Sequence, residues 1–534
     1  MKKYIFVTGG VCSSLGKGIA ASSLGNLLES RGLNVRMIKI DPYINVDAGT
    51  MSPYQHGEVY VTDDGAETDL DLGNYARFTN SVLSREHSIT TGQIYWEVIT
   101  AEREGRYLGK TVQVIPHITD RIKQRILSIG EAPGVNVTII EVGGTVGDIE
   151  SIPFLEAARQ MIMEVGRENI ISVHLTLIPE VAGGELKTKP TQHSVNKMRE
   201  IGVQPDILMC RAPHPVEDDL RRKIAAFTSV PFEAVISAHD VKSIYELPIV
   251  YGEQKLDEIV LKRLGMEIPP AKGRDRWEKL VAGVVNADRT IIIGMVGKYI
   301  ELGDSYKSVD EALVHGGMAN GVKIKIQKID SEKLESAGPA ELEQAFAGVD
   351  GILVPGGFGA RGILGMTIAA KWAREHQLPY FGICLGMQIM VIEYARSIMG
   401  WTDANSTEFV PDCAHPVVSL LEEQVDVKNY GGTMRLGLSE SLFKKGSKIA
   451  AAYGKESVQE RHRHRYEVAN KYRNDLEAAG LVIAGTTPGG ELVESVQWPG
   501  HPWGIGVQYH PEFLSKPLKA HPLFASFIHA CTQN

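Results

Sequence analysis

The feature that most constrains the fold is an alternation of short, β-branched apolar runs with longer stretches that have the spacing of amphipathic helices. This order is typical of parallel α/β sheets, in which each helix returns the chain to the start of the next strand. In the first half we expect strands at 4–7, 35–40, 137–141, 170–177 and 207–210. In the second half the expected strands are 290–296, 322–329, 351–355, 380–383, 481–485, 494–498 and 504–509.

A polar stretch near the middle divides the chain, whose 534 residues are too many for one hydrophobic core. This stretch, GMEIPPAKGRDRWEKL, contains adjacent prolines and a cluster of charges, which is typical of a linker. We therefore predict two parallel-sheet α/β domains, at residues 1–265 and 289–534, joined by a linker at 266–288. The first would be a P-loop-like domain, because a glycine-rich loop follows its first strand.

Composition argues against several classes of protein. The net charge of −9, with one short basic cluster at 461–465, argues against nucleic-acid binding. No run approaches the roughly 20 apolar residues of a membrane helix, and the apolar stretch at the start is too short for a signal peptide. The cysteines are odd in number and widely spaced, which argues against a disulfide framework and for a reducing, cytoplasmic location. They are Cys12, Cys210, Cys384, Cys413 and Cys531.

Cys384 stands between two glycines in YFGICLGMQ, where an expected strand ends and an amphipathic helix begins. One interpretation is a small buried thiol in a crowded turn, since free cysteine is often buried. The other is a nucleophile elbow, which has this strand–turn–helix context. At a helix N-terminus the free N–H groups and the helix dipole would stabilise a thiolate.

The groups that such a nucleophile needs occur elsewhere in the second half. GVQYHPEF supplies His510 and Glu512, two residues apart and therefore on one side of an extended segment, so that Glu512 can orient His510. LVPGGFG places Gly356 and Gly357 at a strand end, where their N–H groups, with that of Leu385, could bind an oxyanion. Each pattern alone is weak evidence.

Together, and in this order, the motifs from Thr290 to about Ala530 resemble the class I glutamine amidotransferase domain. The resemblance implies that Cys384, His510 and Glu512 hydrolyse glutamine to glutamate and ammonia through a thioester. It also implies that Arg465 binds the α-carboxylate of glutamine. The implied glutamine-binding residues are Gly357, Leu385, Gly386, Met387, Gln388, Glu408 and Arg465.

The glycine-rich loop FVTGGVCSSLGKG departs from the usual phosphate-loop pattern GxxxxGK[ST]. The interval from Gly10 to Gly16 is one residue too long, and Gly18 follows Lys17 where Ser or Thr is expected. A plain glycine-rich turn is the alternative. The N–H groups of residues 13–19, at a helix N-terminus, would nevertheless form an anion cradle, with Lys17 and Lys39 as cations.

Without a hydroxyl after Lys17, Mg²⁺ would need carboxylate ligands. Glu141 ends the apolar run VTIIE, and Asp71 lies in an acidic run whose alternative interpretation is a solvated loop. Two polar stretches, 143–151 and 187–194, each follow a strand, where α/β sheets place ligands. The lysines of KTKPTQ suit a second polyphosphate, although a basic surface turn would look the same.

Five further stretches of the first half resemble the amidoligase domain of the CTP synthase family: YIFVTGGVCSSLGKGIAASSLG, KIDPYINVDAGTMSPYQHGEV, GAETDLDLGNY, EVGGTVGDIES and KTKPTQHSV. The same family is resembled in the second half by VPGGFG, GICLGMQ, NSTEFVPD, GGTMRLG and RHRHRYEV. The resemblance implies formation of CTP, ADP, phosphate and glutamate from UTP, ATP, glutamine and water. ATP would phosphorylate the uracil 4-oxygen, and ammonia carried through an internal tunnel would then displace phosphate.

The same resemblance implies the sites of the amidoligase reaction. Mg²⁺ would lie on Asp71 and Glu141, and His56 and Val59 would line the ammonia tunnel. The implied ATP-binding residues are Ser14, Leu15, Gly16, Lys17, Gly18, Ile19, Lys39, Asp71 and Val241. The implied residues for UTP, and in part for the feedback inhibitor CTP, are Ser13, Asp148, Ile149, Glu150, Lys187, Thr188, Lys189, Pro190, Thr191, Gln192 and Lys223.

Regulation and assembly are further implications of the resemblance. GTP would activate through a lid that includes residues 431–437, and the chain would form homotetramers, with filaments compatible with catalysis. Two positions depart from the family pattern, namely His239, where relatives carry lysine, and Cys12, where they carry an aliphatic residue. The alternatives are an amidoligase that acts on a carboxylate or another ring, and a polymerising scaffold built on an ATPase fold.

Overall fold

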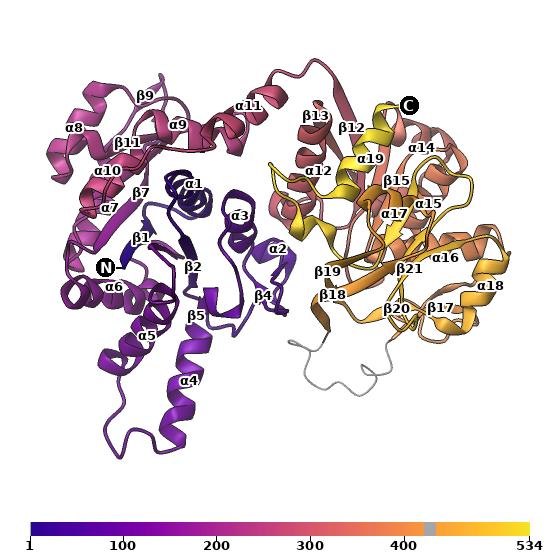
Figure 1. Cartoon of the computed structure of the whole chain (residues 1–534), viewed down its shortest axis with the longest axis horizontal. Coiled ribbons are helices and arrows are strands. Elements are labelled where there is room, and N and C mark those ends of the chain that lie inside the picture. The colour runs from indigo at the N-terminus through magenta and orange to yellow at the C-terminus, as the bar shows by residue number, and fades with distance from the viewer. Residues whose placement is uncertain (1, 421–433, 534) are drawn as a thin grey trace. The chain divides into compact units, whose positions relative to one another are not determined.

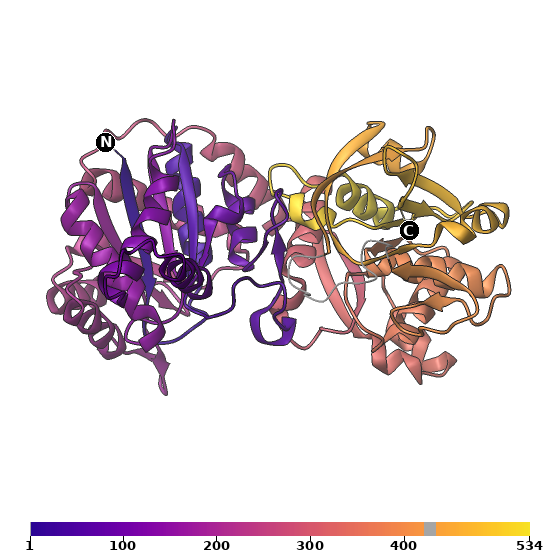
Figure 2. The same ribbon diagram turned by 90° about the horizontal axis from the view of Figure 1, so that it is seen from below.

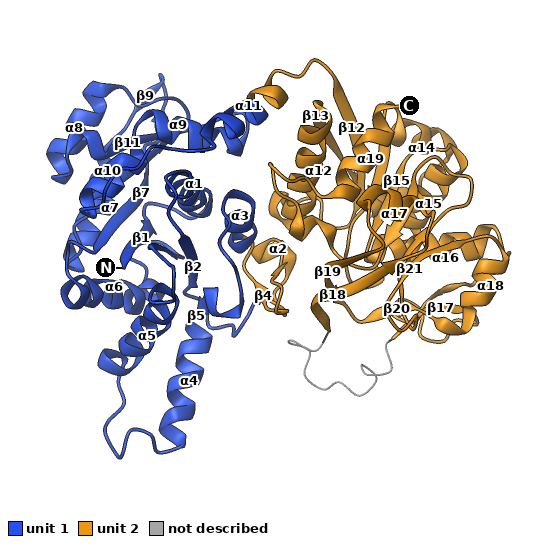
Figure 3. Cartoon of the chain, in the orientation of Figure 1, with its two compact units in different colours: residues 1–48, 71–281 blue, residues 49–70, 282–534 orange. Residues whose placement is uncertain are grey.

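The computed structural model describes residues 2–420 and 434–533, and the chain forms two compact units (Figure 3). Unit 1 comprises residues 1–48 and 71–281, and unit 2 comprises residues 49–70 and 282–534. This division differs from the predicted one, because residues 49–70 pack within unit 2. The predicted linker is also partly a helix, α11 (Arg274–Val285), which buries Trp277 and Val281, four residues apart on one face.

Unit 1 contains a parallel sheet with the strand order β11-β10-β7-β1-β6-β2-β5, as predicted for a parallel α/β domain (Figure 1). All five expected strands are present, whereas β5 and β11 were not anticipated. Its strands are β1 (Lys3–Gly9), β2 (Val35–Asp41), β5 (Ser88–Thr90), β6 (Val137–Val142), β7 (Ile170–Leu177), β10 (Ile207–Ala212) and β11 (Val235–His239), with a small hairpin of β8 (Glu180–Val181) and β9 (Glu185–Leu186).

Helices cover both faces of this sheet (Figures 1 and 2). Phe6, Ile38 and Ile140 face the layer that contains α4, α5 and α6, whereas Met37 and Ile139 pack near Gly25 of α1 on the other face. Side chains alternate along a strand, so Lys39 and Glu141 lie on the α1 face. The helices are α1 (Lys17–Ser30), α3 (Asp71–Phe78), α4 (Thr91–Arg103), α5 (Thr119–Gly130), α6 (Ile152–Val165), α7 (Lys189–Glu200), α8 (Asp218–Thr228), α9 (Leu247–Glu253) and α10 (Leu256–Arg263).

Unit 2 contains a mixed sheet with the strand order β13-β12-β14-β15-β23-β22-β21-β18-β19. The strands from β13 to β23 are parallel, as predicted, whereas β22, β21, β18 and β19 add antiparallel pairs. The predicted α/β domain with a parallel sheet is therefore confirmed, and the antiparallel pairs extend that sheet beyond what was predicted. Only short loops join β21 to β22 and β22 to β23, and a parallel crossover needs a dozen residues or more.

The strands of this sheet are β12 (Thr290–Gly297), β13 (Lys323–Asp330), β14 (Gly351–Val354), β15 (Tyr380–Ile383), β18 (Arg435–Phe443), β19 (Ser457–His464), β21 (Val482–Thr486), β22 (Val493–Gln497) and β23 (Gly504–Val507). Two smaller sheets complete the unit: β16 (Asn405–Ser406) with β17 (Pro416–Leu420) and β20 (Tyr466–Val468), and the hairpin of β3 (Tyr60–Val61) and β4 (Glu67–Thr68).

Two helical layers enclose the large sheet of unit 2. One layer contains α15 and α16, and the other contains α12 and α19. Among the described residues, no helix is both long and apolar enough to span a bilayer. The helices are α2 (Pro53–His56), α12 (Lys307–Asn320), α13 (Ser331–Glu335), α14 (Pro339–Phe346), α15 (Ile363–Glu375), α16 (Leu385–Ser397), α17 (Lys448–Tyr453), α18 (Arg473–Ala478) and α19 (Pro522–Thr532).

Candidate functional site

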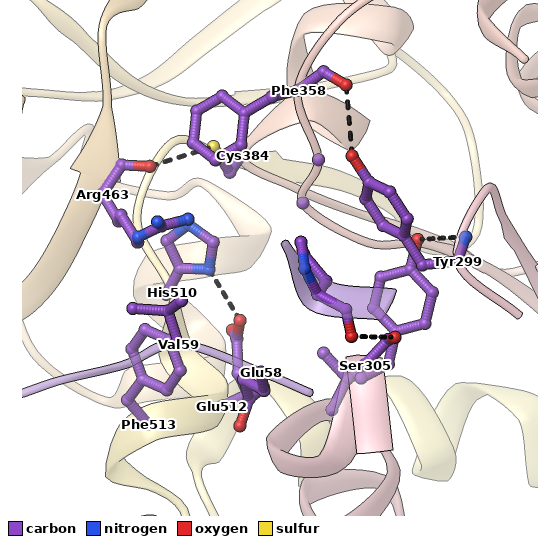
Figure 4. A pocket seen from close by; sticks show the side chains of 15 residues that line it. Glu58, Val59, Tyr299, Ser305, Phe358, Cys384, Arg463, His510, Glu512 and Phe513 are labelled. Atoms are coloured by element: carbon purple, nitrogen blue, oxygen red, sulfur yellow. Dashed lines mark hydrogen bonds and ion pairs between the residues drawn. The ribbon is translucent and has the colours of Figure 1, made fainter. Parts of the chain in front are cut away.

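A pocket in unit 2 brings Cys384, His510 and Glu512 together (Figure 4). Cys384 follows β15, Gly356 and Gly357 follow β14, and these parallel strands end at the same edge of the sheet. That edge is where α/β proteins place their ligands.

The backbone at Cys384 has the strained turn that a nucleophile elbow requires. Its φ of 51° and ψ of −100° are unfavourable for a residue with a side chain, and its N–H donates to the Val507 carbonyl at 2.7 Å. A Cβ on Gly382 would lie 2.5 Å from the carbonyl of Gly386, and one on Gly386 would lie 2.1 Å from the Val354 oxygen. The flanking glycines are therefore dictated by close backbone packing.

His510 is held by Glu512 beside the thiol. Its Nδ1 lies 2.6 Å from Glu512 Oε1, and a Cβ on Gly356 would lie 2.8 Å from His510 Cε1 and 3.7 Å from Cys384 Cβ. Burial lowers the pKa of His510, but the negative charges of Glu512 and Cys384 outweigh burial and raise the pKa to about 10. At neutral pH the arrangement therefore favours an imidazolium at His510, beside the Cys384 side chain.

We expect Glu512→Gln to reduce kcat/KM for glutamine hydrolysis by roughly 10²-fold and to shift the alkaline limb of its pH profile to lower pH. The reason is that the amide removes a negative charge that raises the pKa of His510, so the imidazolium is lost earlier as pH rises. The measurement is kcat/KM between pH 6 and 10, with the exposed Glu491→Gln as control. A profile of unchanged shape would contradict this role.

One of the predicted glutamine-binding residues lines this pocket, and the others lie outside its lining. Gly357 lines it, and a Cβ there would lie 3.3 Å from the Leu385 side chain. Gln388 is buried and donates to the Tyr466 carbonyl at 3.0 Å. Glu408 accepts a 2.6 Å hydrogen bond from the Gly359 N–H, and burial raises the pKa of its carboxyl.

Other predicted glutamine-binding residues take different positions. Gly386 and Met387 face the core, where Gly386 abuts Val354 and Met387 packs on Gly506. Arg465 lies half-buried between β19 and β20 and is not among the residues that line the pocket, whereas Arg463 is.

Sequence reasoning missed Lys298, which follows β12 at the same sheet edge. Its Nζ donates to the carbonyls of Phe358 at 2.9 Å and Gly359 at 2.6 Å, and burial lowers its pKa to about 8. Lys298 therefore fixes the loop that holds Gly357. Its position after a strand was a detectable signal, since Cys384 was recognised in the same way.

A second cluster of charges lies in unit 1, around the start of α1. Lys39 Nζ lies 2.5 Å from Asp71 Oδ2, 3.4 Å from Glu141 Oε1 and 3.5 Å from Asp41 Oδ1. Lys17 Nζ donates to the Gly144 carbonyl at 2.5 Å, and burial lowers its pKa. The structure thus brings together both predicted lysines and both predicted metal-binding carboxylates.

The two carboxylates differ in their electrostatic state. Burial, reinforced by the charge of Asp71, raises the pKa of Glu141 to about 7, and the Tyr75 hydroxyl donates to it. Burial also acts to raise the pKa of Asp71, but Lys39 outweighs burial and lowers it. An ammonium between a buried and a partly buried carboxylate marks a position suited to a cation, and oxygen ligands suit Mg²⁺. Among the described residues, no group of three or more potential metal ligands occurs.

Gly18 explains the departure from the usual phosphate-loop pattern. A Cβ at this position would lie 1.8 Å from Asp71 Oδ1, so the carboxylate oxygen occupies the space that a Ser or Thr side chain would take. Asp71 thereby brings an oxygen ligand to the place where the usual pattern has a hydroxyl.

A cavity of about 290 Å³ lies beside the start of α1. It is lined by the predicted ATP-binding residues Leu15, Gly16, Ile19 and Val241, together with Arg211 and other side chains. Ser13 and Ser14 lie in the exposed part of the loop, where Ser14 has a φ of 58°. His239, at the end of β11, lies 3.4 Å from Ser237 Oγ through its Nδ1 and does not line this cavity.

Apart from Ser13, the predicted UTP residues occupy three parts of unit 1. Residues 148–150 form an exposed turn after β6. Residues 187–192 run from β9 into α7, and there Lys187 pairs with Glu185 at 2.6 Å and the Thr191 hydroxyl lies 3.1 Å from that of Thr176. Lys223 lies in α8.

Sequence reasoning missed the link between α7 and the phosphate loop. Buried His174 lies 2.8 Å from the Thr8 hydroxyl and 2.7 Å from that of Ser194, and burial lowers its pKa to about 3. A Cβ on Gly10 would lie 1.7 Å from Ser194 Oγ. The neutral imidazole thus connects the end of β1 to α7.

The two predicted tunnel residues both belong to unit 2. Val59 lines the Cys384 pocket, whereas His56 is exposed at the end of α2 and is not among the lining residues. Of the predicted GTP lid, residues 431–433 lie outside the described part of the chain.

Comparisons with known proteins show which families the two halves of the chain resemble. Residues 3–266 match the family described as CTP synthase N-terminus, and residues 301–530 match glutamine amidotransferase class-I. CTP synthase of Desulfitobacterium hafniense is 54% identical over 100% of both chains, and that of Acidobacterium capsulatum is 55% identical over 100% of this chain and 96% of the relative. The solved glutaminase domain of Trypanosoma brucei CTPS is 42% identical over 46% of this chain and 94% of that one, with a TM-score of 0.43.

Proposed function

The chain belongs to the CTP synthase family, and on that premise we propose how its two sites divide the ATP-dependent, glutamine-dependent formation of CTP. Unit 2 releases ammonia from glutamine, and unit 1 uses that ammonia to aminate UTP. The observation that carries this assignment is the pocket in which Glu512 holds His510 beside Cys384.

In unit 2 the Cys384 thiolate attacks the carboxamide carbon of glutamine. The N–H groups of Gly357 and Leu385 stabilise the oxyanion. The N–H of Leu385 is free for this role because it is the first in α16, and the first N–H groups of a helix lack intrahelical acceptors. His510 then gives its proton to the departing nitrogen, so ammonia leaves and a thioester remains. His510 next accepts a proton from water, which hydrolyses the thioester to glutamate. Gln388, Glu408 and Arg465 are proposed to hold glutamine.

In unit 1 the cavity lined by Leu15, Ile19 and Val241 would receive the adenine of ATP, and the loop before α1 its phosphates. Lys17 and Lys39 offset the charge on the phosphoryl group as it passes to the uracil 4-oxygen. Ammonia then attacks C4, and phosphate leaves. Bound Mg²⁺ would be held by Asp71 and Glu141 and would neutralise phosphate charge. Residues 187–192, with the turn at 148–150, are proposed to hold UTP.

Regulation and assembly are proposed from the family resemblance. CTP would inhibit at part of the UTP site, GTP would activate glutamine hydrolysis, and the chain would form a homotetramer. His56 and Val59 would lie on the path of ammonia. A cytoplasmic location fits the five free cysteines.

The test is CTP formation from UTP with ATP and Mg²⁺, with either glutamine or ammonium chloride as the nitrogen source. We expect CTP to form with both nitrogen sources, and glutamate to be released only when glutamine is the source. Glutamine hydrolysis without amination of UTP under either condition would show that the acceptor is wrong and would favour an amidoligase for another substrate. Failure to hydrolyse glutamine would reject the assignment of unit 2.

A further inference from the structure

The hairpin of β3 and β4 (60–68) is held to β19 by two arginines. Arg463 Nε lies 2.9 Å from Glu67 Oε1, and Arg461 Nε lies 2.7 Å from Asp63 Oδ1. Arg461 also donates to the Tyr60 hydroxyl at 2.6 Å. The two arginines are two residues apart on β19, so their side chains extend to the same side of the strand, toward the hairpin.

The Arg463–Glu67 pair is the more buried of the two. Glu67 is 5% exposed, whereas half of the Asp63 side chain is open to solvent. Arg463 also donates to the Gly49 carbonyl at 3.3 Å, so one guanidinium holds both the beginning and the end of residues 49–70. Removing one member of a buried pair leaves an uncompensated charge, which perturbs the partner strongly.

The same two arginines contact the catalytic groups through their backbone. The His510 N–H donates to the Arg461 carbonyl at 2.8 Å, and the Cys384 thiol lies 3.9 Å from the Arg463 carbonyl. Arg463 also lines the pocket (Figure 4), with its guanidinium 5.1 Å from the centre of the Phe358 ring. Displacement of β19 would therefore displace both the thiol and the imidazole.

The hairpin continues directly into the other site. Only Asp69 and Leu70 separate Thr68 from Asp71, which begins α3 of unit 1 and contacts Lys39. Glu67, which pairs with Arg463, is therefore four residues before Asp71, which contacts Lys39 in unit 1.

We propose that Arg463 and Glu67 are positioning residues that couple glutamine hydrolysis to CTP formation, an inference that rests on the proposed function. The Arg463 guanidinium holds the hairpin, and the Arg463 backbone carbonyl contacts the Cys384 thiol. The state of the glutamine site is thereby linked to the segment that carries Asp71.

The test is Glu67→Gln, which keeps the side-chain shape and removes the charge. We expect glutamine-dependent CTP formation to fall about tenfold and the glutamate released per CTP to rise at least about twofold, while ammonium-dependent CTP formation stays within about twofold of wild type. The control is Glu456→Gln, the same chemical change at an exposed position next to β19.

A double-mutant cycle separates the ion pair from general destabilisation. We expect Glu67→Gln combined with Arg463→Gln to lose no more glutamine-dependent activity than Arg463→Gln alone, because the pair is then already broken. Equal losses with glutamine and ammonium, or a result like that of Glu456→Gln, would overturn the inference. If wild type itself formed no CTP from either nitrogen source, the proposed function would fail instead.

Discussion

Cys384→Ala is expected to reduce glutamine-dependent CTP formation by at least about 10³-fold and to leave ammonium-dependent CTP formation within about twofold of wild type. The alanine removes the atom that forms the thioester, and no other described group lies where a second nucleophile could replace it: Glu512 and His510 act on protons, and Lys298 is committed to two carbonyls. The measurement is CTP formation with each nitrogen source, together with glutamate release.

The matched control is Cys413→Ala, because Cys413 is also free and lies in unit 2 but does not line the pocket. We expect this variant to behave as wild type with both nitrogen sources. Retention of glutamine-dependent activity in Cys384→Ala would reject the thioester mechanism. An equal loss with glutamine and ammonium would show that the substitution disturbs the fold rather than removing a nucleophile.

The strands and the reactive groups of this chain could be predicted because their signals are local. A buried parallel strand is a continuous apolar run, as in VTIIE, and such runs marked β1, β6, β7 and β15. Cys384 lies at a turn between two glycines that close backbone packing dictates, so its neighbours in sequence reveal it.

The assignment of residues 49–70 to unit 2 could not be predicted, because the interactions that place this segment join positions about 400 residues apart. The residues next to Glu67 and Arg463 in the sequence give no sign of their pairing. Nothing in the RHRHR cluster indicates that Arg461 and Arg463 bind a hairpin far away in the sequence. Strands β18 and β19 were missed for a related reason. β18 and β19 are polar at many positions, so neither has the apolar run by which the other strands were recognised.

Asp71→Asn is expected to reduce CTP formation with both nitrogen sources by at least about 10²-fold, while glutamine hydrolysis in unit 2 persists. The carboxylate lies 2.5 Å from Lys39 and fills the space beside Gly18 where a phosphate loop usually carries a hydroxyl. An amide keeps that shape but is neutral, so it binds Mg²⁺ weakly and leaves Lys39 with Glu141 and Asp41 as its carboxylate partners.

The measurement compares CTP formation and glutamate release across a range of Mg²⁺ concentrations, with the thermal midpoint as a check of folding. Asp275→Asn is the control, because Asp275 also lies in the first turn of a helix but is exposed. Gly18→Ala tests the same position without a change of charge, since its Cβ would displace the Asp71 carboxylate. Both variants should lose amination together. An Asp71→Asn enzyme that aminated UTP normally would remove Asp71 from the metal site and leave Glu141 as its single proposed protein ligand.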